Sequence, residues 1–247
     1  MLAALAAERD PPTTVVDPEQ AIHLHVADSL SALELPFLRG AAAIADVGAG
    51  AGFPGLPLAI ALPQARVDLL ESARRKCAVI ERLAVAAGAD NARAVPARAE
   101  DWVRAGGRCT YDVVTARAVA PLAVLCEYAA PLLSQEGALV CWKGARNREE
   151  EQAGRVAAAE LGLRADEVRP VQPFPDARDR HLHSFRKLQP TSARFPRRAG
   201  MAAKRPLGST GPARKELPTD SPNTVATWVR SMPSPTRRAA SERPLRR

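Results

Sequence analysis

Short β-like runs alternate with helical stretches from Ala43 onward, and this alternation is typical of a parallel sheet covered by helices. Parallel neighbours need crossover connections, which the helical stretches between the runs provide. The sequence therefore predicts an α/β fold with a doubly wound, seven-stranded, mostly parallel sheet. The predicted strands are Ala43–Val47, Arg66–Glu71, Ala92–Val95, Tyr111–Ala116, Gly137–Lys143, Asp166–Val171 and His181–Lys187.

Three helices have signals that locate them. The clearest lies at 73–87, where Ser72 can cap the start and Gly88 stands at a position that favours a left-handed C-terminal cap. Asn147 is predicted to cap another helix, with Glu150 completing a capping box. Residues 18–35 predict a third helix, docked beside the sheet. Its expected buried face consists of Ile22, Val26, Leu30 and Leu33.

The composition differs between the two ends of the chain. Of its 247 residues 46% are apolar, enough for a core of ordinary size, which excludes disorder throughout. The net charge of +8 arises from residues 188–247, which also hold nine of the 22 prolines. We therefore expect an N-terminal helical segment at 1–40, a domain at 41–188 and a basic, mostly unfolded tail at 189–247.

Neither a membrane span nor a secretory signal is predicted. The longest apolar candidate, Ala118–Leu133, is interrupted by Glu127 and two prolines and favours a buried helix. The N-terminus lacks the basic residues that open a signal peptide, so we expect a cytoplasmic protein. Cysteines without a C-x-x-C spacing predict reduced core thiols and no zinc site; they are Cys77, Cys109, Cys126 and Cys141.

The glycine-rich stretch after the first predicted strand is the strongest candidate for a ligand site. Gly48, Gly50 and Gly52 let the backbone turn tightly and approach a ligand without Cβ clashes. Ligands of open α/β sheets bind beyond the carboxyl ends of the strands. A nicotinamide or flavin fingerprint would need Gly or Ala where this chain has Phe53, which disfavours such a cofactor. A tight turn without a ligand is the alternative.

Glu71 ends the second predicted strand, 19 residues after Gly52. An acid at this place can accept hydrogen bonds from the ribose hydroxyls of a nucleotide cofactor. By itself, the same acid is also compatible with capping of the helix that follows. Together, the glycines and Glu71 favour a cofactor that contains a nucleoside.

The order of these motifs resembles class I S-adenosylmethionine-dependent methyltransferases. The stretch Asp46 to Ile60, DVGAGAGFPGLPLAI, is similar to the D-V-G-x-G-x-G-[FL]-P-G-[IL]-P-L motif of the RsmG family, also called glucose-inhibited division protein B. The resemblance implies a Rossmann-like class I fold and methylation of N7 of a guanine in bacterial 16S ribosomal RNA. Further similar segments span roughly 17–208: His25–Leu30, Arg98–Glu100, Thr115–Ala118, Lys143–Gly144, Arg180–Leu182 and Phe195–Gly200.

The resemblance also implies a set of residues that bind S-adenosylmethionine. In this set Ala99 and Glu100 surround the adenine, and Arg117 lies near the methionine end or the substrate. The role of Glu71 at the ribose follows from the wider methyltransferase class. The full set is Gly48, Gly50, Phe53, Glu71, Ala99, Glu100 and Arg117.

The reaction implied by the resemblance needs no catalytic base, because guanine N7 carries a lone pair and no proton. The work of the protein is then to place the base beside the methyl group. Arg117 and Lys143, at the ends of the fourth and fifth predicted strands, are expected to face the substrate. Lys143 is equally compatible with a solvated charge.

Two His-x-His pairs offer a metal site as a competing interpretation. His23 and His25 lie on the helix predicted at 18–35, where they diverge by about 200°. His181 and His183 lie on a predicted strand and share a face there, but no cysteine or carboxylate pattern accompanies them. We therefore expect no metal.

The implied partner is 16S ribosomal RNA, free or within the small subunit, and we expect a monomer. Since residues 1–187 are slightly acidic, phosphate contacts are assigned to the tail. Two alternatives stay open: a class I methyltransferase that acts on a protein or small molecule, and a ribosome-assembly factor without catalytic activity. The tail cations expected to contact phosphates are Arg194, Arg197, Arg198, Lys204 and Arg205.

Overall fold

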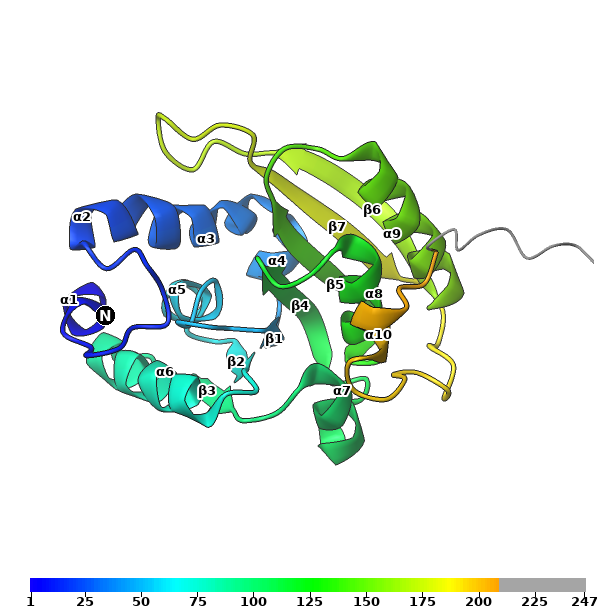
Figure 1. The fold of residues 1–247 in the computed structure, drawn as a ribbon, viewed down its shortest axis with the longest axis horizontal. Helices are drawn as coiled ribbons and strands as arrows, with labels where there is room; N and C mark the ends of the chain where they lie inside the picture. Colours follow the sequence, from blue (N-terminus) through cyan, green and yellow to red (C-terminus); the bar gives the residue numbers. More distant parts are fainter. Residues whose placement is uncertain (209–247) are drawn as a thin grey trace, which may run out of the picture. The chain divides into compact units, whose positions relative to one another are not determined.

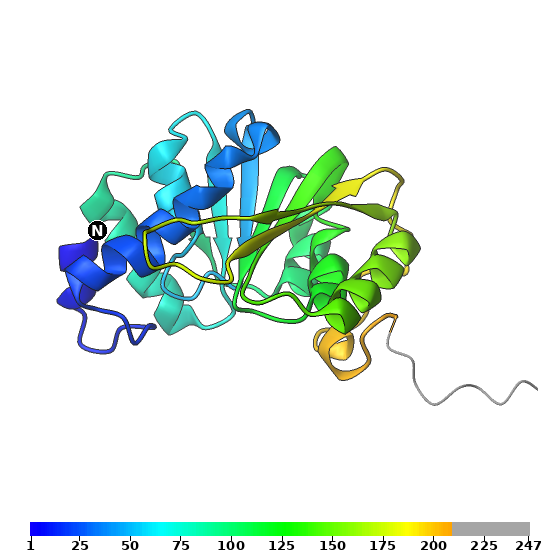
Figure 2. The ribbon, with the colours of Figure 1, turned by 90° about the horizontal axis from the view of Figure 1, so that it is seen from above.

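The computed structural model describes residues 1–208, which form a seven-stranded sheet with helices on both faces (Figures 1 and 2). The strand order is β3-β2-β1-β4-β5-β7-β6. Strands β1 to β5 are parallel, whereas β7 is antiparallel to both β5 and β6. The predicted doubly wound, mostly parallel sheet is confirmed. The strands are β1 (Ala43–Val47), β2 (Arg66–Leu70), β3 (Ala92–Val95), β4 (Tyr111–Arg117), β5 (Leu133–Lys143), β6 (Leu163–Pro170) and β7 (His181–Lys187).

From β1 the strand order runs outward in both directions, so its switch point lies between β1 and β4.

Helices connect the parallel strands and precede the sheet. Within residues 1–208 no helix is long and apolar enough to cross a membrane. The helical elements are α1 (Leu2–Ala6), α2 (Pro18–Ala21), η1 (Ile22–Ala27), α3 (Asp28–Leu30), η2 (Ser31–Glu34), α4 (Pro36–Arg39), α5 (Gly55–Ala61), α6 (Arg74–Ala87), α7 (Ala99–Trp102), η3 (Val103–Gly107), α8 (Leu122–Ala129), α9 (Arg148–Glu160) and α10 (Met201–Lys204).

Alternate side chains of the sheet face two separate cores. One core contains buried residues of α4, α5 and α6, and the other contains buried residues of α7, α8 and α9. Strand β1 contributes Ile44 to the first core and Ala45 and Val47 to the second, as the two-residue period of a strand requires. Both faces of the central strands are therefore buried, which explains their nearly continuous apolar sequence.

The segment predicted as one helix at 18–35 consists of four short helical pieces, α2, the π-helical turn η1, α3 and the 3-10 turn η2. Its predicted buried face is wrong at Ile22, whereas Leu33 is half-buried and packs against the first core. Ile22 is 51% exposed, whereas Asp28, Ser29 and Ala32 are buried. The wider and tighter turns shift later residues away from the 3.6-residue period on which the prediction rested.

The start of α6 also differs from the prediction. Ala73 precedes the first helical residue, and the Ser72 hydroxyl donates to the Glu71 carboxylate at 3.4 Å instead of capping the helix. The predicted end is confirmed, because Gly88 has a φ of +64° in the left-handed region.

Helix α9 is capped by Asn147, whose side chain accepts the N–H groups of Glu149 and Glu150 at 3.0 Å each, as predicted. The capping box is wrong. The Glu150 carboxylate instead accepts the Leu122 N–H at 3.0 Å and pairs with Lys143.

Cys109 is exposed, so its prediction as a core thiol is wrong, whereas the other three cysteines are buried as expected. Cys109 lies in the connection before β4 with a φ of +52°, outside the strand that carries the apolar pattern. Burial raises the pKa of Cys141 to about 12, which keeps this thiol protonated and unreactive.

Residues 189–208, here called the C-terminal segment, pack against α8 and the α7 region. Phe195 is only 2% exposed and belongs to the second core. Arg197 donates through Nε to the buried Glu127 carboxylate at 2.8 Å, and Arg104 donates to the Pro196 carbonyl at 3.2 Å. The sequence analysis includes this segment in the mostly unfolded tail, because the segment has no periodic apolar pattern. In the structure, single side chains such as Phe195 and Arg197 attach it, and such contacts leave no periodic pattern in the sequence. The expectations for residues 209–247 lie outside the described residues.

Candidate active site

The glycine-rich loop crosses the carboxyl ends of β1 and β2. The N–H groups of Gly48 and Ala49 donate to the Leu70 carbonyl at 2.8 and 3.1 Å. Gly48 has a φ of +69°, and a Cβ there would lie 2.7 Å from a methyl of Val119. Only glycine allows this backbone conformation and this close approach of the β4–α8 connection. The loop is therefore held at the edge of the sheet where the predicted ligand site lies.

Asp46 supports the loop from below. Its side chain accepts the Gly55 N–H at 3.0 Å and the Thr115 hydroxyl at 2.8 Å, and it is fully buried. Burial raises the pKa of Asp46 to about 7, although both hydrogen bonds and Arg117 act in the opposite direction. No role was predicted for Asp46, although it stands at the end of a strand directly before a glycine loop.

Because the pKa of Asp46 is higher in the folded chain than its ordinary value of 3.8, the protonated carboxyl favours the folded state. Its contribution to stability is full below about pH 4 and declines as the pH rises through about 7. We expect the free energy of unfolding to fall by about 1 kcal/mol between pH 6 and pH 8. Asp46→Asn should remove this decline, because an amide does not titrate in this pH range. The variant should stay folded, because the amide oxygen can still accept the Gly55 N–H. Urea unfolding of both proteins at several pH values tests this, and an equal decline in both would contradict it.

Glu71 connects the glycine loop to the start of α6. One carboxylate oxygen accepts the Gly50 N–H at 3.2 Å, and the other accepts the Ala73 N–H at 2.8 Å. The oxygen that accepts from Ala73 also receives the Ser72 hydroxyl at 3.4 Å, whereas the oxygen that accepts from Gly50 can accept a further hydrogen bond, so capacity for a ligand hydroxyl remains. The sequence allowed two interpretations of Glu71, as an acceptor for the ribose hydroxyls and as a cap for the helix that follows. The structure is compatible with both.

A cavity of about 180 Å³ lies beyond the ends of β1 and β2, and we call it the smaller cavity. It is lined by four residues that the sequence assigned to the cofactor, Gly48, Glu71, Ala99 and Glu100. The Glu100 carboxylate also accepts the Gly200 N–H at 2.9 Å, so the C-terminal segment fixes its position. Gly50 does not line the smaller cavity, but its N–H donates to the Glu71 carboxylate, which does.

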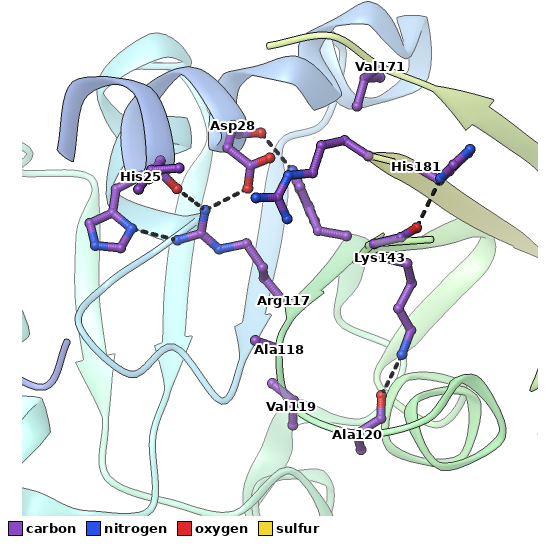
Figure 3. A pocket seen from close by; sticks show the side chains of 13 residues that line it. His25, Asp28, Arg117, Ala118, Val119, Ala120, Lys143, Val171 and His181 are labelled. Carbon is purple, nitrogen blue, oxygen red and sulfur yellow. Dashed lines mark hydrogen bonds and ion pairs between the residues drawn. The ribbon is translucent and has the colours of Figure 1, made fainter. Parts of the chain in front are cut away.

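A second cavity, of about 630 Å³, lies beyond the ends of β4 and β5, and we call it the larger cavity (Figure 3). Val119 lines both cavities, so the two are neighbours at the switch point of the sheet. The larger cavity is rich in groups that form hydrogen bonds. Its polar lining comprises His25, Asp28, Arg117, Lys143, Arg180 and His181.

Arg117 lines the larger cavity and not the smaller one. Its guanidinium donates to the Asp28 carboxylate at 2.9 Å and to the Leu24 carbonyl at 3.2 Å (Figure 3). Phe53 also lies outside the smaller cavity. Its ring stacks on His25 with centroids 4.4 Å apart and lies 5.7 Å from the Arg117 guanidinium carbon. The structure thus places Phe53 and Arg117 with the 18–34 helical segment.

Lys143 is not a solvated charge. Its ammonium pairs with Glu150 at 2.6 Å and donates to the Ala120 carbonyl at 3.0 Å. Lys143 therefore fixes the connection between β4 and α8, which forms part of the wall of the larger cavity (Figure 3).

The histidines make separate contacts. His25 hydrogen-bonds the Thr13 hydroxyl at 3.0 Å, and His181 donates through Nδ1 to the Gly144 carbonyl at 3.0 Å. Burial and the neighbouring Arg117 lower the pKa of His25, so it is neutral at physiological pH. Among residues 1–208 no group of three or more His, Cys, Asp or Glu side chains is arranged to hold a metal ion.

Two of the tail cations assigned to RNA are engaged in ion pairs. Arg197 pairs with the buried Glu127, and Arg194 pairs with Glu160 at 2.6 Å. Arg198 and Lys204 are exposed, and within residues 1–208 they form no ion pair. Sequence alone showed the charges of this segment but not the acids that neutralise two of them.

Known proteins resemble this chain in sequence and in fold. A family model described as rRNA small subunit methyltransferase G (GidB) matches residues 11–182. Ribosomal RNA small subunit methyltransferase G of Rubrobacter xylanophilus is 42% identical over 199 residues, which cover 79% of this chain and 76% of that protein. The protein of the same name from Deinococcus radiodurans is 41% identical over 210 residues, 84% of this chain and 83% of that protein.

Two solved structures with a similar fold are named as methyltransferases. Mitomycin 7-O-methyltransferase MmcR has a TM-score of 0.55 at 16% identity, covering 70% of this chain and 55% of that chain. A predicted O-methyltransferase from Agrobacterium tumefaciens, Atu636, has a TM-score of 0.51 at 24% identity, covering 65% and 80%. These likenesses confirm the predicted Rossmann-like class I methyltransferase fold. The family match and the two relatives show that the chain belongs to the rRNA small subunit methyltransferase G (GidB) family.

Proposed function

We propose that the chain transfers a methyl group from S-adenosylmethionine to N7 of one guanine in 16S ribosomal RNA. The observation that carries this proposal is the pair of neighbouring cavities at the switch point of the sheet, which share Val119. The smaller cavity offers a carboxylate and a glycine loop to a nucleoside. The larger cavity offers several hydrogen-bonding side chains to a base. The names of the relatives support ribosomal RNA as the substrate.

The residues of the smaller cavity fit the adenosine part of S-adenosylmethionine. Glu71 keeps acceptor capacity for the ribose hydroxyls, and the missing Cβ of Gly48 leaves room beside Val119. Ala99 and Glu100 form the wall assigned to the adenine. When bound, S-adenosylmethionine supplies an electrophilic methyl group on its sulfonium.

The protein residues act by placement, since N7 needs no base to attack a methyl group. Arg117 connects β4 to the 18–34 helical segment through Asp28 and Leu24, which fixes one wall of the larger cavity. Lys143 fixes the opposite connection through Ala120. Stationary walls hold the base in line with the methyl group and exclude water from the sulfonium.

We further infer that the enzyme acts as a monomer in the cytoplasm and contacts 16S RNA, free or within the small subunit, partly through backbone phosphates. Arg198 and Lys204 support the phosphate contacts, because both are exposed and unpaired within residues 1–208.

Glu71→Ala is expected to weaken S-adenosylmethionine binding by about 1–3 kcal/mol, because a ribose would lose a charged acceptor. Glu71→Gln keeps one carbonyl acceptor and should fall between wild type and alanine. Isothermal titration measures the affinities, with circular dichroism as the control for folding. Unchanged affinity in a folded alanine variant would remove Glu71 from the cofactor site.

The methylated atom can be identified chemically. Borohydride reduction followed by aniline breaks RNA at 7-methylguanosine, so the product should break at one defined position. Single-turnover rates should stay flat from mildly acidic to mildly basic pH, since no group must lose a proton. Methyl incorporation without a break would contradict N7, and a steep rise of the rate with pH would contradict the base-free mechanism. No methyl transfer to RNA at all would leave a protein or small-molecule substrate, or an assembly factor.

A further inference from the structure

The larger cavity contains two charged side chains, Asp28 and Arg180, with polar atoms that have no hydrogen-bond partner within residues 1–208. The Asp28 carboxylate uses Oδ2 to accept from Arg117 at 2.9 Å, while Oδ1 has no hydrogen-bond partner within residues 1–208. The Arg180 side chain forms no hydrogen bond or ion pair with any residue in the same range, and its Nε is buried without an acceptor. The other cations of the cavity, Arg117 and Lys143, are already paired. A ligand therefore has one free carboxylate oxygen, Oδ1 of Asp28, and one free guanidinium, that of Arg180, to contact.

We infer that the larger cavity distinguishes guanine from other bases, with Asp28 accepting from N1–H and the N2 amino group and Arg180 donating to O6. This inference rests on the proposed function, since it concerns the base that is methylated. It assigns base recognition to Asp28 and Arg180, for which the sequence analysis predicted no role.

The chemistry of the purine edge matches this pair of charges. Guanine presents a carbonyl acceptor at O6 beside donors at N1 and N2. Adenine presents the reverse, an amino donor at position 6 beside an acceptor at N1. A carboxylate facing adenine N1 and a guanidinium facing its amino group would both be repelled, and these buried groups would lose their hydrogen bonds. A site built in this way rejects the wrong base by leaving its own charges unpaired.

The arrangement of the walls suits the geometry of the reaction. N7 must face the neighbouring cofactor cavity, whose shared wall is Val119. The N1 and N2 positions then lie on the far side of the purine from N7. Figure 3 shows Asp28 and Val119 at opposite ends of the larger cavity, with Asp28 on the 18–34 helical segment. Asp28 is therefore placed to meet the edge of the base that points away from the methyl group.

Inosine provides a direct test, because it keeps N7, O6 and N1–H and lacks only the N2 amino group. Small subunits are assembled on ribosomal RNA that carries guanosine or inosine at the methylated position, and single-turnover rates are measured. Wild type should methylate guanosine about 10- to 100-fold faster than inosine, as expected for the loss of one hydrogen bond to a charged group. Asp28→Asn should slow guanosine methylation and bring the ratio of the two rates close to one.

Arg180→Met tests the contact to O6. Both nucleosides carry O6, so this variant should slow both to the same extent and keep the wild-type ratio. Arg178→Met removes an exposed cation from the same loop and should leave both rates unchanged. If Arg180→Met and Arg178→Met slowed methylation equally, the positive charge of the loop would explain the loss. That outcome would contradict a contact between Arg180 and O6.

The outcomes separate this inference from the proposed function. Equal wild-type rates on guanosine and inosine, with methylation at N7, would overturn recognition by Asp28 and leave the proposed function intact. A purely structural Asp28, acting through Arg117, would slow both substrates equally and keep the ratio, which would also overturn the inference. Absence of N7 methylation by wild type on the guanosine substrate would instead contradict the proposed function.

Discussion

Replacing Arg197 by alanine is expected to lower the free energy of unfolding by about 3–5 kcal/mol, because it leaves a buried carboxylate without its partner. Glu127 has a side chain only 1% exposed and accepts from Arg197 at 2.8 Å. The paired Glu127 carboxylate and the packing of Phe195 attach the C-terminal segment to α8. Without the arginine, the Glu127 carboxylate has no partner. It must then either reach water, which detaches the C-terminal segment, or take up a proton.

Arg194→Ala is the matched control. This arginine lies in the same segment and also forms an ion pair, but its side chain is 64% exposed and that of its partner Glu160 is 39% exposed. An exposed pair contributes at most about 1 kcal/mol. Urea unfolding of the two variants measures the difference. Similar decreases in the free energy of unfolding for both variants would contradict a special role of the buried Arg197–Glu127 pair. Adding Glu127→Gln to Arg197→Ala should recover part of the loss, since the unpaired charge is then removed.

Arg117→Ala is expected to slow methyl transfer about 100-fold, because the wall that places the base loses its connection to β4. Arg117 bonds Asp28 and Leu24 and lies 5.7 Å from the Phe53 ring, so its removal weakens the attachment of the 18–34 helical segment beside the larger cavity. It lines no part of the smaller cavity. We therefore expect the affinity for S-adenosylmethionine to change by less than about threefold, a split that separates placement of the base from binding of the cofactor.

Single-turnover rates and isothermal titration measure the two quantities separately. Arg117→Lys serves as the control, because an ammonium can keep the charge pair with Asp28 but not the second bond to Leu24. It should slow the reaction less than alanine does. A large loss of cofactor affinity with an unchanged rate at saturation would place Arg117 at the methionine end of the cofactor instead.

The C-terminal segment acts first as part of the fold. It anchors Glu127, and its Gly200 N–H holds the Glu100 carboxylate at the smaller cavity. Removing residues 189–208 would therefore disturb the cofactor site as well as any RNA contact. Variants of Arg198 and Lys204, which have no ion pair within residues 1–208, are the cleaner probes of phosphate binding.

The alternation of strands and helices was sufficient to predict the sheet and the place of the site. Alternation forces a parallel sheet, and a parallel sheet brings the carboxyl ends of its strands to one edge. Gly48 and Glu71, which end neighbouring strands, therefore had to lie close together, and the structure places them in one cavity. Local signals succeeded where the backbone decides, as for Asn147 and Gly88, which act at the ends of their own helices.

Only the tertiary structure decided which charges are paired. Asp28 and Arg117 are 89 residues apart, and Glu127 and Arg197 are 70 residues apart, so no periodicity connects them. A charged residue in a sequence has the same appearance whether it meets solvent, phosphate or a buried acid, because pairing depends on distance in space and on burial. Sequence therefore determined the fold class, the glycine loop and the acid beside it. The folded chain decided that Arg197 is an anchor, that Arg117 fixes a wall, and that Asp28 and Arg180 keep free groups in the larger cavity.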